Sequence, residues 1–290
     1  MIIVITGPTA VGKTKLSVVL AKIYNGEIIN ADSTQVYKGM DIGTAKVTKE
    51  EMEGIKHHLL DIKEVTDDYS VFDYQHDARC KIEEIKSKGK VPILVGGTGY
   101  YIKAALYNYV FNEEEEKKDY QDLSLEEINK KLDNFQVNFD KNNRRRCVRF
   151  LEKLESETYQ EQNDFKLLYD DVLFIGLTTD REVLYKRINQ RLDDMFIDLV
   201  DEVKPFYLKR YKSKALQTAI GYKELYEFFD NKKTLREVSE LIKQNTRNYA
   251  KKQYTWFNNQ MNIQWFSVDF ENFSNTINKI ILYIEKGSKR

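Results

Sequence analysis

The chain has 290 residues, and 41% of them are hydrophobic, enough for a sizeable core in one large domain or in a domain with an insertion. Its 46 Lys and Arg balance its 46 Asp and Glu, so bulk charge predicts no partner, and affinity for a polyanion must come from local clusters. Cys80 and Cys147 lack metal-ligand spacing and a disulfide framework, which is typical of a reducing cytoplasm. The first residues already form a strand pattern, and no apolar run approaches the ~20 residues that cross a bilayer. We therefore expect a cytoplasmic protein with no membrane partner.

The N-terminal segment joins a predicted strand to a predicted helix through a glycine-rich loop. The apolar run 2–6 predicts a buried strand, and helical periodicity is expected over 13–25. The loop between them consists of Gly7, Pro8, Thr9, Ala10, Val11, Gly12, Lys13 and Thr14. This GxxxxGK[ST] pattern is typical of a P-loop, in which backbone N–H groups hold a diphosphate, the lysine adds a point charge and the threonine hydroxyl binds Mg²⁺. The motif does not decide whether the diphosphate belongs to a nucleotide.

The second predicted strand, 27–31, places an acid beside this loop. It is followed by Asp32, Ser33, Thr34 and Gln35. P-loop sites need an acid at the end of a nearby strand, to orient Mg²⁺ or to act as a base. In open α/β sheets the carboxyl ends of the strands border the ligand crevice, so we expect Asp32 to lie next to the P-loop.

The next two predicted strands contribute a pair of histidines and a glycine-rich turn. In the strand 57–62, His57 and His58 are adjacent, so they point to opposite faces and are expected to be structural. The strand 91–96, which follows a helix expected over 71–88, ends in a Gly-Gly-Thr-Gly turn. A second Mg²⁺ carboxylate is therefore missing there, and Thr98 with its neighbouring amides is predicted to form a second polar wall of the crevice.

The stretch 112–165 interrupts the alternation of strands and helices. It opens with four consecutive glutamates, which we interpret as a solvated loop, and holds a predicted helix near 125–135. After it come strands expected at 171–177 and 263–268 and helices at 180–196 and 234–258. The chain is thus predicted to be an α/β protein with a P-loop NTPase-like parallel sheet flanked by helices, built from 1–111 and 166–290, with a small helical insertion and C-terminal helices.

Basic residues gather on three predicted helices. Each cluster taken alone is more often a solvated face. The three clusters together, interleaved with aromatic residues in a chain of zero net charge, favour a surface for a polyanion. The clusters are Arg144 to Arg146 with Arg149; Arg187 with Arg191, on a helix that Thr179 and Glu182 are expected to cap; and Lys243, Arg247 and Lys251 beside Tyr249 and Trp256.

Taken together, the motifs resemble those of the tRNA dimethylallyltransferases, over nearly the whole chain and in the same order. The matching segments are Gly7–Thr14, Asp32–Tyr37, Met40–Lys46, His57–Asp61, Gly96–Gly99, Arg187–Met195, Ile220–Lys223 and Thr246–Trp256. That family transfers a dimethylallyl group from its diphosphate to N6 of adenine 37, next to the anticodon of tRNA. The sequence departs from the family pattern after Met195, where the usual glycine is missing, and this concerns the grip on tRNA more than the reaction.

The resemblance implies roles for the residues already identified. The P-loop would hold the diphosphate of dimethylallyl diphosphate without consuming ATP, and Asp32 would be the general base. Lys13, Arg191 and a Mg²⁺ held by Thr14 would stabilise the leaving group, with Thr98 close to the reacting atoms. The implied contacts to tRNA are Asp32, Ser33, Thr34, Gln35, Arg145, Arg146, Arg149, Gly221, Tyr222, Lys223, Arg247 and Lys251. We expect the protein to act as a monomer.

Three alternatives stay open from the sequence. A small-molecule kinase would share the P-loop and the acid but would not need the basic, aromatic C-terminal helix. An adenylate isopentenyltransferase would use the same donor on free AMP or ADP and would not need the match over 213–258. A P-loop protein that only binds RNA would not need Asp32 and Thr98 beside Lys13.

Overall fold

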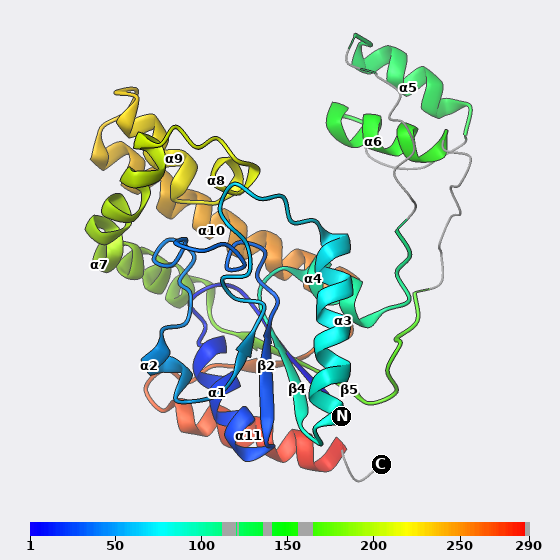
Figure 1. Cartoon of the computed structure of the whole chain (residues 1–290), viewed down its shortest axis with the longest axis vertical. Coiled ribbons are helices and arrows are strands. Elements are labelled where there is room, and N and C mark those ends of the chain that lie inside the picture. The colour runs from blue at the N-terminus through cyan, green and yellow to red at the C-terminus, as the bar shows by residue number, and fades with distance from the viewer. Residues whose placement is uncertain (112–119, 121, 136–140, 156–164, 288–290) are drawn as a thin grey trace. The chain divides into compact units, whose positions relative to one another are not determined.

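The computed structural model describes residues 1–111, 120, 122–135, 141–155 and 165–287. The chain divides into two compact units, Met1–Tyr107 with Leu167–Arg290, and Asn108–Lys166 (Figure 1). Tyr107 and Leu167 pair in an isolated antiparallel bridge, where the chain leaves and re-enters the first unit. The bounds predicted from the sequence, 112 and 165, lie a few residues inside this division. The predicted glutamate loop falls outside the described residues.

The first unit is built on a sheet of six strands that are parallel throughout, in the order β3-β2-β4-β1-β5-β6. The strands are β1 (Ile2–Thr6), β2 (Gly26–Asn30), β3 (His57–His58), β4 (Val91–Val95), β5 (Val172–Thr178) and β6 (Gln264–Ser267). The predicted α/β fold with a parallel sheet is confirmed. The third strand is shorter than its predicted range, 57–62, because the backbone turns through positive φ at Leu59 and Asp61.

Helices cover both faces of the sheet, which explains the continuous apolar runs of the strands. Successive side chains of β1 alternate between the two faces. Ile3 and Ile5 pack with α1 (Lys13–Ile23) and α11 (Phe273–Gly287), whereas Val4 packs with α3 (Val71–Ser87) and α4 (Gly99–Leu106). None of the described helices has the length and apolar character that a bilayer crossing requires.

A group of helices lies beyond the carboxyl ends of the strands (Figure 1). It consists of α7 (Arg181–Leu208), α8 (Lys214–Thr218), α9 (Tyr222–Phe229) and α10 (Leu235–Gln260), while the short α2 (Lys49–Met52) precedes β3. Helix α7 continues well past its predicted end at 196. The expected capping box is wrong by one residue, because Asp180 is the N-cap and accepts hydrogen bonds from the backbone of Glu182 and Val183.

The second unit is a pair of helices with a small core of its own. Helix α5 (Leu125–Asp133) agrees with the helix expected near 125–135, and α6 (Arg144–Leu154) carries the first arginine cluster. Ile128 and Leu132 of α5 pack against Cys147 and Leu151 of α6. Arg145, Arg146 and Arg149 lie on the exposed face of α6.

Candidate functional site

The P-loop connects β1 to α1 by a backbone that curls tightly. Gly7 has φ 136°, and a Cβ there would lie 2.4 Å from the carbonyl oxygen of Leu177, so only glycine fits. Ala10 has φ 66°, a strained value for a residue with a side chain. Its carbonyl oxygen accepts a hydrogen bond of 3.1 Å from Nε of Arg187, so helix α7 supports the loop at this point. Val11 is fully buried and packs in the hydrophobic core.

Lys13 is the charged centre of the loop. Its Nζ donates hydrogen bonds to the carbonyl oxygens of Gly7 at 3.0 Å and Pro8 at 2.7 Å. Burial lowers the pKa of Lys13 to about 8; the negative charge of Asp32 opposes this shift, and the positive charge of Arg191 adds to it. The structure therefore brings these three predicted residues together. A half-buried ammonium beside a second cation is suited to an anionic ligand such as a diphosphate.

Asp32 follows β2 in a fixed orientation. Its backbone N–H donates to the side chain of Asn30 at 3.0 Å. Its Oδ1 accepts two hydrogen bonds from Thr34, one from the backbone at 3.0 Å and one from the hydroxyl at 2.7 Å. Since both bonds fall on Oδ1, the other carboxylate oxygen is the one better placed to take up a proton.

Thr98 links the glycine turn after β4 to the segment that follows Asp32. Its hydroxyl oxygen accepts a hydrogen bond of 3.1 Å from the backbone N–H of Ser33. The turn itself lies under α10, because a Cβ on Gly97 would meet the Gln253 amide at 2.1 Å and one on Gly99 would meet the ring of Trp256 at 2.0 Å. Thr98 and the glycine turn therefore lie beside the segment that follows Asp32, as the predicted second polar wall requires.

Tyr249, which the sequence marked only as an aromatic residue beside the basic cluster of α10, lies near Asp32 and Thr98. Burial and the charge of Asp32 raise its pKa, while hydrogen bonds from Thr98 and Gln253 oppose the rise. Gln253, one turn further along α10, donates to the carbonyl oxygen of Gly97 at 3.0 Å, and its own Oε1 is buried without a hydrogen-bond partner in the described chain. Tyr249 as a whole residue is 37% exposed, so part of it reaches the surface. Gln253, a polar residue on the buried face of a basic helix, was the available sequence signal for this part of the site.

The motif Ile220–Lys223, which is predicted to contact tRNA, is bound to helix α7 through Glu202, a residue that sequence reasoning missed. Tyr222 is fully buried, and its hydroxyl donates to the carboxylate of Glu202. The side chain of Tyr222 has no surface for RNA, which corrects the prediction of a direct contact. Gly221 has φ 98° and bonds Glu224, and only Lys223 of this motif extends an exposed side chain.

Two of the three basic residues in the α10 cluster contact α7, since Lys243 pairs with Asp193 of that helix. Arg247 donates to Asn189 of α7 at 2.6 Å and lies near the ring of Tyr185, while Lys251 is exposed. The arginines of α6 belong to the other unit. Gln35, by contrast, is held within the first unit, where its amide donates to the carbonyl oxygens of Thr44 and Ala45.

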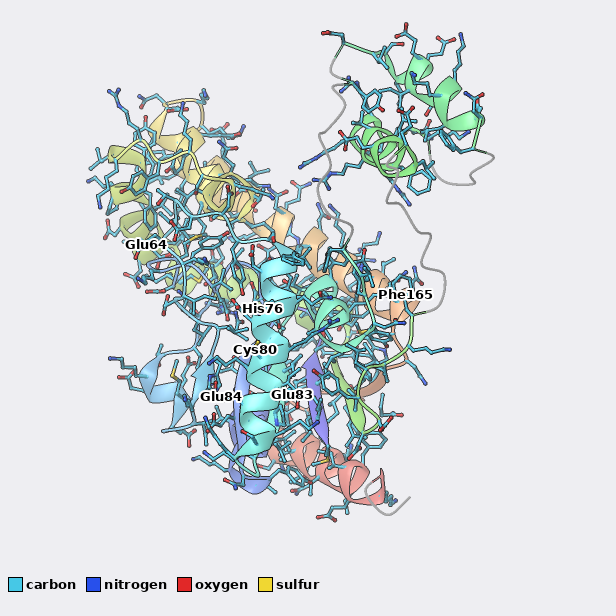
Figure 2. The ribbon with its side chains drawn as sticks, turned by 45° about the vertical axis from the view of Figure 1, so that its right-hand side comes forward. Glu64, His76, Cys80, Glu83, Glu84 and Phe165 are labelled. Atoms are coloured by element: carbon cyan, nitrogen blue, oxygen red, sulfur yellow. The ribbon has the colours of Figure 1, made fainter. Side chains whose placement is uncertain are left out.

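The histidines and cysteines have structural or surface positions. His58 bonds the buried Glu27 at 2.7 Å, and His57 bonds the carbonyl oxygen of Ile55, which confirms their structural role. Cys80 is a free thiol that lies with His76, Glu83 and Glu84 along α3 (Figure 2). Within the described residues, no group of three or more His, Cys, Asp or Glu side chains could hold a metal ion.

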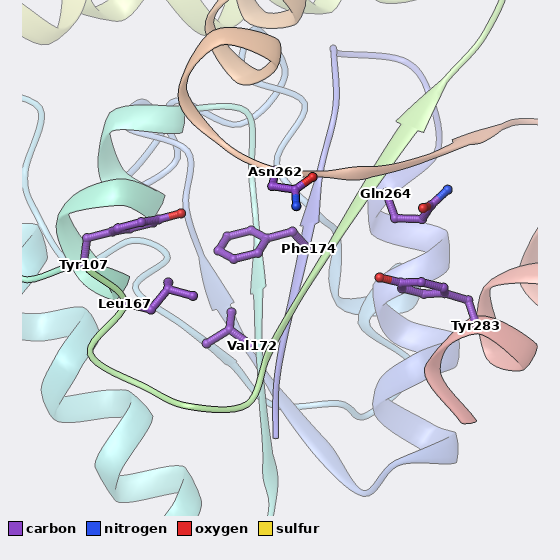
Figure 3. Close-up of a pocket in the computed structure, with 7 residues that line it drawn as sticks. All are labelled: Tyr107, Leu167, Val172, Phe174, Asn262, Gln264 and Tyr283. Atoms are coloured by element: carbon purple, nitrogen blue, oxygen red, sulfur yellow. The ribbon is translucent and has the colours of Figure 1, made fainter. Parts of the chain in front are cut away.

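A pocket of about 350 Å³ lies at the end of the strands that is opposite the P-loop (Figure 3). Val172 begins β5 and Gln264 begins β6, so the pocket opens at the amino ends of these strands, whereas the P-loop lies at the carboxyl ends. The residues that line it are Tyr107, Leu167, Val172, Phe174, Asn262, Gln264 and Tyr283. None of them is among the predicted site residues.

Comparisons with known proteins agree with the site. The chain is 48% identical to the tRNA dimethylallyltransferase of Anoxybacillus flavithermus, over 98% of this chain and 96% of that protein. It is 41% identical to the solved tRNA isopentenylpyrophosphate transferase of Bacillus halodurans, with a TM-score of 0.76 over 99% and 98% of the two chains. A eukaryotic dimethylallyltransferase solved while acting on tRNA is 30% identical, with a TM-score of 0.82 over 97% of this chain and 77% of that one. A sequence model of the IPP transferase family matches residues 35–260, and this protein therefore belongs to that family.

Proposed function

We propose that this protein transfers a dimethylallyl group from dimethylallyl diphosphate to N6 of adenine 37 in tRNA, giving N6-(dimethylallyl)adenosine. The observation that carries the proposal is a P-loop lysine, Lys13, within reach of the charge of Asp32, beside a strand β4 that ends in a glycine turn and Thr98. A phosphoryl-transfer enzyme would be expected to place a second metal-binding acid there. Relatives named tRNA dimethylallyltransferase match nearly the whole chain.

The reaction asks for a base, because the exocyclic amine of adenine is a poor nucleophile. As N6 forms a bond to the allylic carbon, the bond from that carbon to the diphosphate oxygen breaks. The proton lost from N6 passes to Asp32, and the diphosphate leaves with the electron pair. The two hydrogen bonds from Thr34 hold the carboxylate in the orientation that this proton transfer needs. Thr98 is placed to bond a group near the reacting carbon.

The departing diphosphate is stabilised by positive charge that is already in place. Lys13, the backbone N–H groups of residues 10–13 and Arg191 surround the position that the P-loop offers to it. A Mg²⁺ ion fits if the Thr14 hydroxyl, phosphate oxygens and water hold it, because Mg²⁺ usually keeps several waters and needs no cage of protein carboxylates. When bound, the ion supplies further positive charge to the leaving group.

The adenine must leave the stacked anticodon loop to reach the donor, and unstacking costs least for bases in single-stranded loops. We expect the protein to act as a monomer in the cytoplasm. The proposed contacts to tRNA are Asp32, Ser33, Thr34, Gln35, Lys223, Arg247 and Lys251 in the first unit, and Arg145, Arg146 and Arg149 in the second. Gly221 is buried, like Tyr222, and is not among them.

The test is incubation with radiolabelled dimethylallyl diphosphate and Mg²⁺, with unmodified tRNA in one reaction and AMP in another. We expect label in the tRNA only, in a nucleoside that co-elutes with N6-(dimethylallyl)adenosine after nuclease digestion. A tRNA with guanosine at position 37 serves as the control and should stay unlabelled.

Two other outcomes would overturn the proposal. Label in AMP but not in tRNA would identify an adenylate isopentenyltransferase. A parallel reaction with ATP would reveal a kinase or an NTPase if ATP is consumed while no label enters the nucleic acid.

A further inference from the structure

A single carboxylate on α7 gathers four hydrogen bonds from two distant segments. One oxygen of Glu202 accepts from the backbone N–H groups of Asp41 at 2.9 Å and Ile42 at 2.7 Å. Its other oxygen accepts from the backbone N–H of Gly43 at 3.2 Å and from the hydroxyl of Tyr222. Hydrogen bonds to an ionised acceptor are about twice as strong as neutral ones, so this carboxylate fixes the backbone of residues 41–43.

The same turn is also held by packing. A Cβ on Gly43 would lie 2.5 Å from the ring of Tyr222 and 2.8 Å from the side chain of Leu199, so both side chains press directly on the glycine. Burial and the negative charge of Glu202 raise the pKa of Tyr222, which keeps its hydroxyl a donor. The turn therefore has little freedom to shift while Glu202 is in place.

The residues that follow this turn hold the segment after Asp32. The carbonyl oxygens of Thr44 and Ala45 accept from the Gln35 amide at 3.0 and 3.4 Å. Lys46 donates to the carbonyl oxygen of Tyr37 at 2.7 Å. Because the Gln35 nitrogen is directed to these carbonyls, its amide oxygen must face away from them.

We propose that Glu202 is a positioning residue for RNA recognition, which fixes the 41–43 turn and, through it, Gln35 and the segment 32–35. This inference rests on the proposed function, since that segment is where tRNA is expected to bind. The donor pocket has separate supports on the same helix, because Arg187 bonds the P-loop and Arg191 lies near Lys13. Loss of Glu202 should therefore weaken binding of RNA and leave binding of the donor intact.

The test compares two variants that each remove one negative charge from α7. In Glu202→Gln the new side-chain NH₂ is a donor that faces a backbone N–H donor of the turn, so at least one hydrogen bond is lost. Asp201→Asn is the control, because Asp201 is an exposed neighbour of Glu202. The loss of a charged hydrogen bond predicts that Glu202→Gln raises KM for tRNA by about 10-fold or more. KM for dimethylallyl diphosphate should stay within about twofold of wild type by the same scale, and Asp201→Asn should change neither value. Tyr222→Phe keeps the ring on Gly43 and should raise KM for tRNA by a smaller factor.

A double variant separates positioning from a general loss of structure. If Glu202 acts through Gln35, Glu202→Gln with Gln35→Ala should bind an anticodon stem-loop RNA no more weakly than the weaker single variant. The inference would be overturned if the two substitutions weakened RNA binding by factors that multiply in the double variant. It would also be overturned if Glu202→Gln raised KM for the donor and KM for tRNA equally. Wild-type transfer is measured first. If wild type fails to modify tRNA, the proposed function fails and the inference fails with it, whereas a failure confined to the variants concerns Glu202 alone.

Discussion

Asp32 and Lys13 are electrostatic partners in the P-loop crevice, although they come from different strand ends. The negative charge of Asp32 favours the protonated lysine, but burial is the larger influence, and Arg191 acts in the same direction as burial. The pKa of Lys13 therefore falls from 10.5 to about 8. A lysine in this condition loses its charge as the pH rises above about 8 unless an anion binds beside it.

The first prediction follows for the pH dependence of donor capture. The protonated lysine binds the diphosphate, so kcat/KM for dimethylallyl diphosphate should be constant below about pH 8 and fall above it. Steady-state rates between pH 6 and 10 check this. Lys13→Arg keeps its charge over the whole range, so its profile, even if lower, should lack the descending limb. If kcat/KM falls above about pH 8 in both proteins, the fall is due to the titration of a group other than Lys13.

The second prediction concerns Asp32 as general base. Asp32→Asn keeps an oxygen for the two hydrogen bonds from Thr34 but cannot accept the N6 proton. The single-turnover rate should fall by about 10²–10⁴, the usual contribution of a general base, while the donor binds nearly as well. Because the negative charge of Asp32 favours the protonated lysine, its loss should lower the pKa of Lys13 further. The fall of kcat/KM with rising pH should then begin at a lower pH. A variant that turns over at the wild-type rate would remove Asp32 from this role.

The main strands and the P-loop could be predicted because their signals are local. A run such as Ile2 to Ile5 is apolar at every position, as a strand buried on both faces requires, and the loop motif follows it directly. Asp32 and Thr98 could be placed because parallel strands end at one edge of the sheet. Helix α11 had a usable pattern too, with Ile277, Ile280 and Ile284 on its buried face.

The remainder of the site depends on contacts that no local pattern encodes. Glu202 and the turn at 41–43 are about 160 residues apart in the chain, and in sequence Glu202 is one of several acids along an amphipathic helix. Tyr222 was assigned to RNA because it lies in a conspicuous motif, yet a buried aromatic residue on a short helix has the same local signature. Only the packing of α7 against α9 distinguishes these cases.

The third prediction tests the hydroxyl of Tyr249. Tyr249→Phe keeps the ring and removes the acceptor for the hydrogen bonds from Thr98 and Gln253. Loss of the hydrogen bond from Thr98, worth ~0.5–1.5 kcal/mol, predicts a single-turnover rate lower by about 2- to 12-fold. Tyr226→Phe is the matched control, since its hydroxyl bonds the carbonyl oxygen of Tyr211 in a different region. Equal single-turnover rates for wild type and Tyr249→Phe would show that the reaction does not depend on the hydrogen bond between Thr98 and the Tyr249 hydroxyl.

The fourth prediction concerns phosphate contacts of the basic helices. Arg149→Ala, Arg247→Ala and Lys251→Ala should each weaken tRNA binding, most strongly at low salt, and reduce the slope of log K against log salt by about 1. Titrations at several salt concentrations measure this. Lys22, which is paired with Glu53, provides the control, and Lys22→Ala should leave the slope unchanged. A variant with the wild-type slope would not belong to the interface.

The fifth prediction separates stability from activity at Glu27, which lies in β2 near the end opposite Asp32. Burial alone would raise the pKa of Glu27, but hydrogen bonds from Lys90 and His58, both 2.7 Å long, lower it from 4.5 to about 2. A depressed carboxyl pKa stabilises the fold above the unfolded value. That stability is lost as the pH falls from about 4.5 towards 2. At neutral pH the contribution is on the order of 3 kcal/mol.

Glu27→Gln should therefore unfold at a lower urea concentration at pH 7, and its deficit relative to wild type should narrow as the pH falls from about 5 to about 3. Activity well below the unfolding midpoint should not change, because Glu27 touches no part of the crevice. Glu53→Gln removes the carboxylate of an exposed ion pair with Lys22 and should cost less than about 1 kcal/mol. A deficit of Glu27→Gln that is independent of pH would mean that the lost contacts act through packing and not through charge.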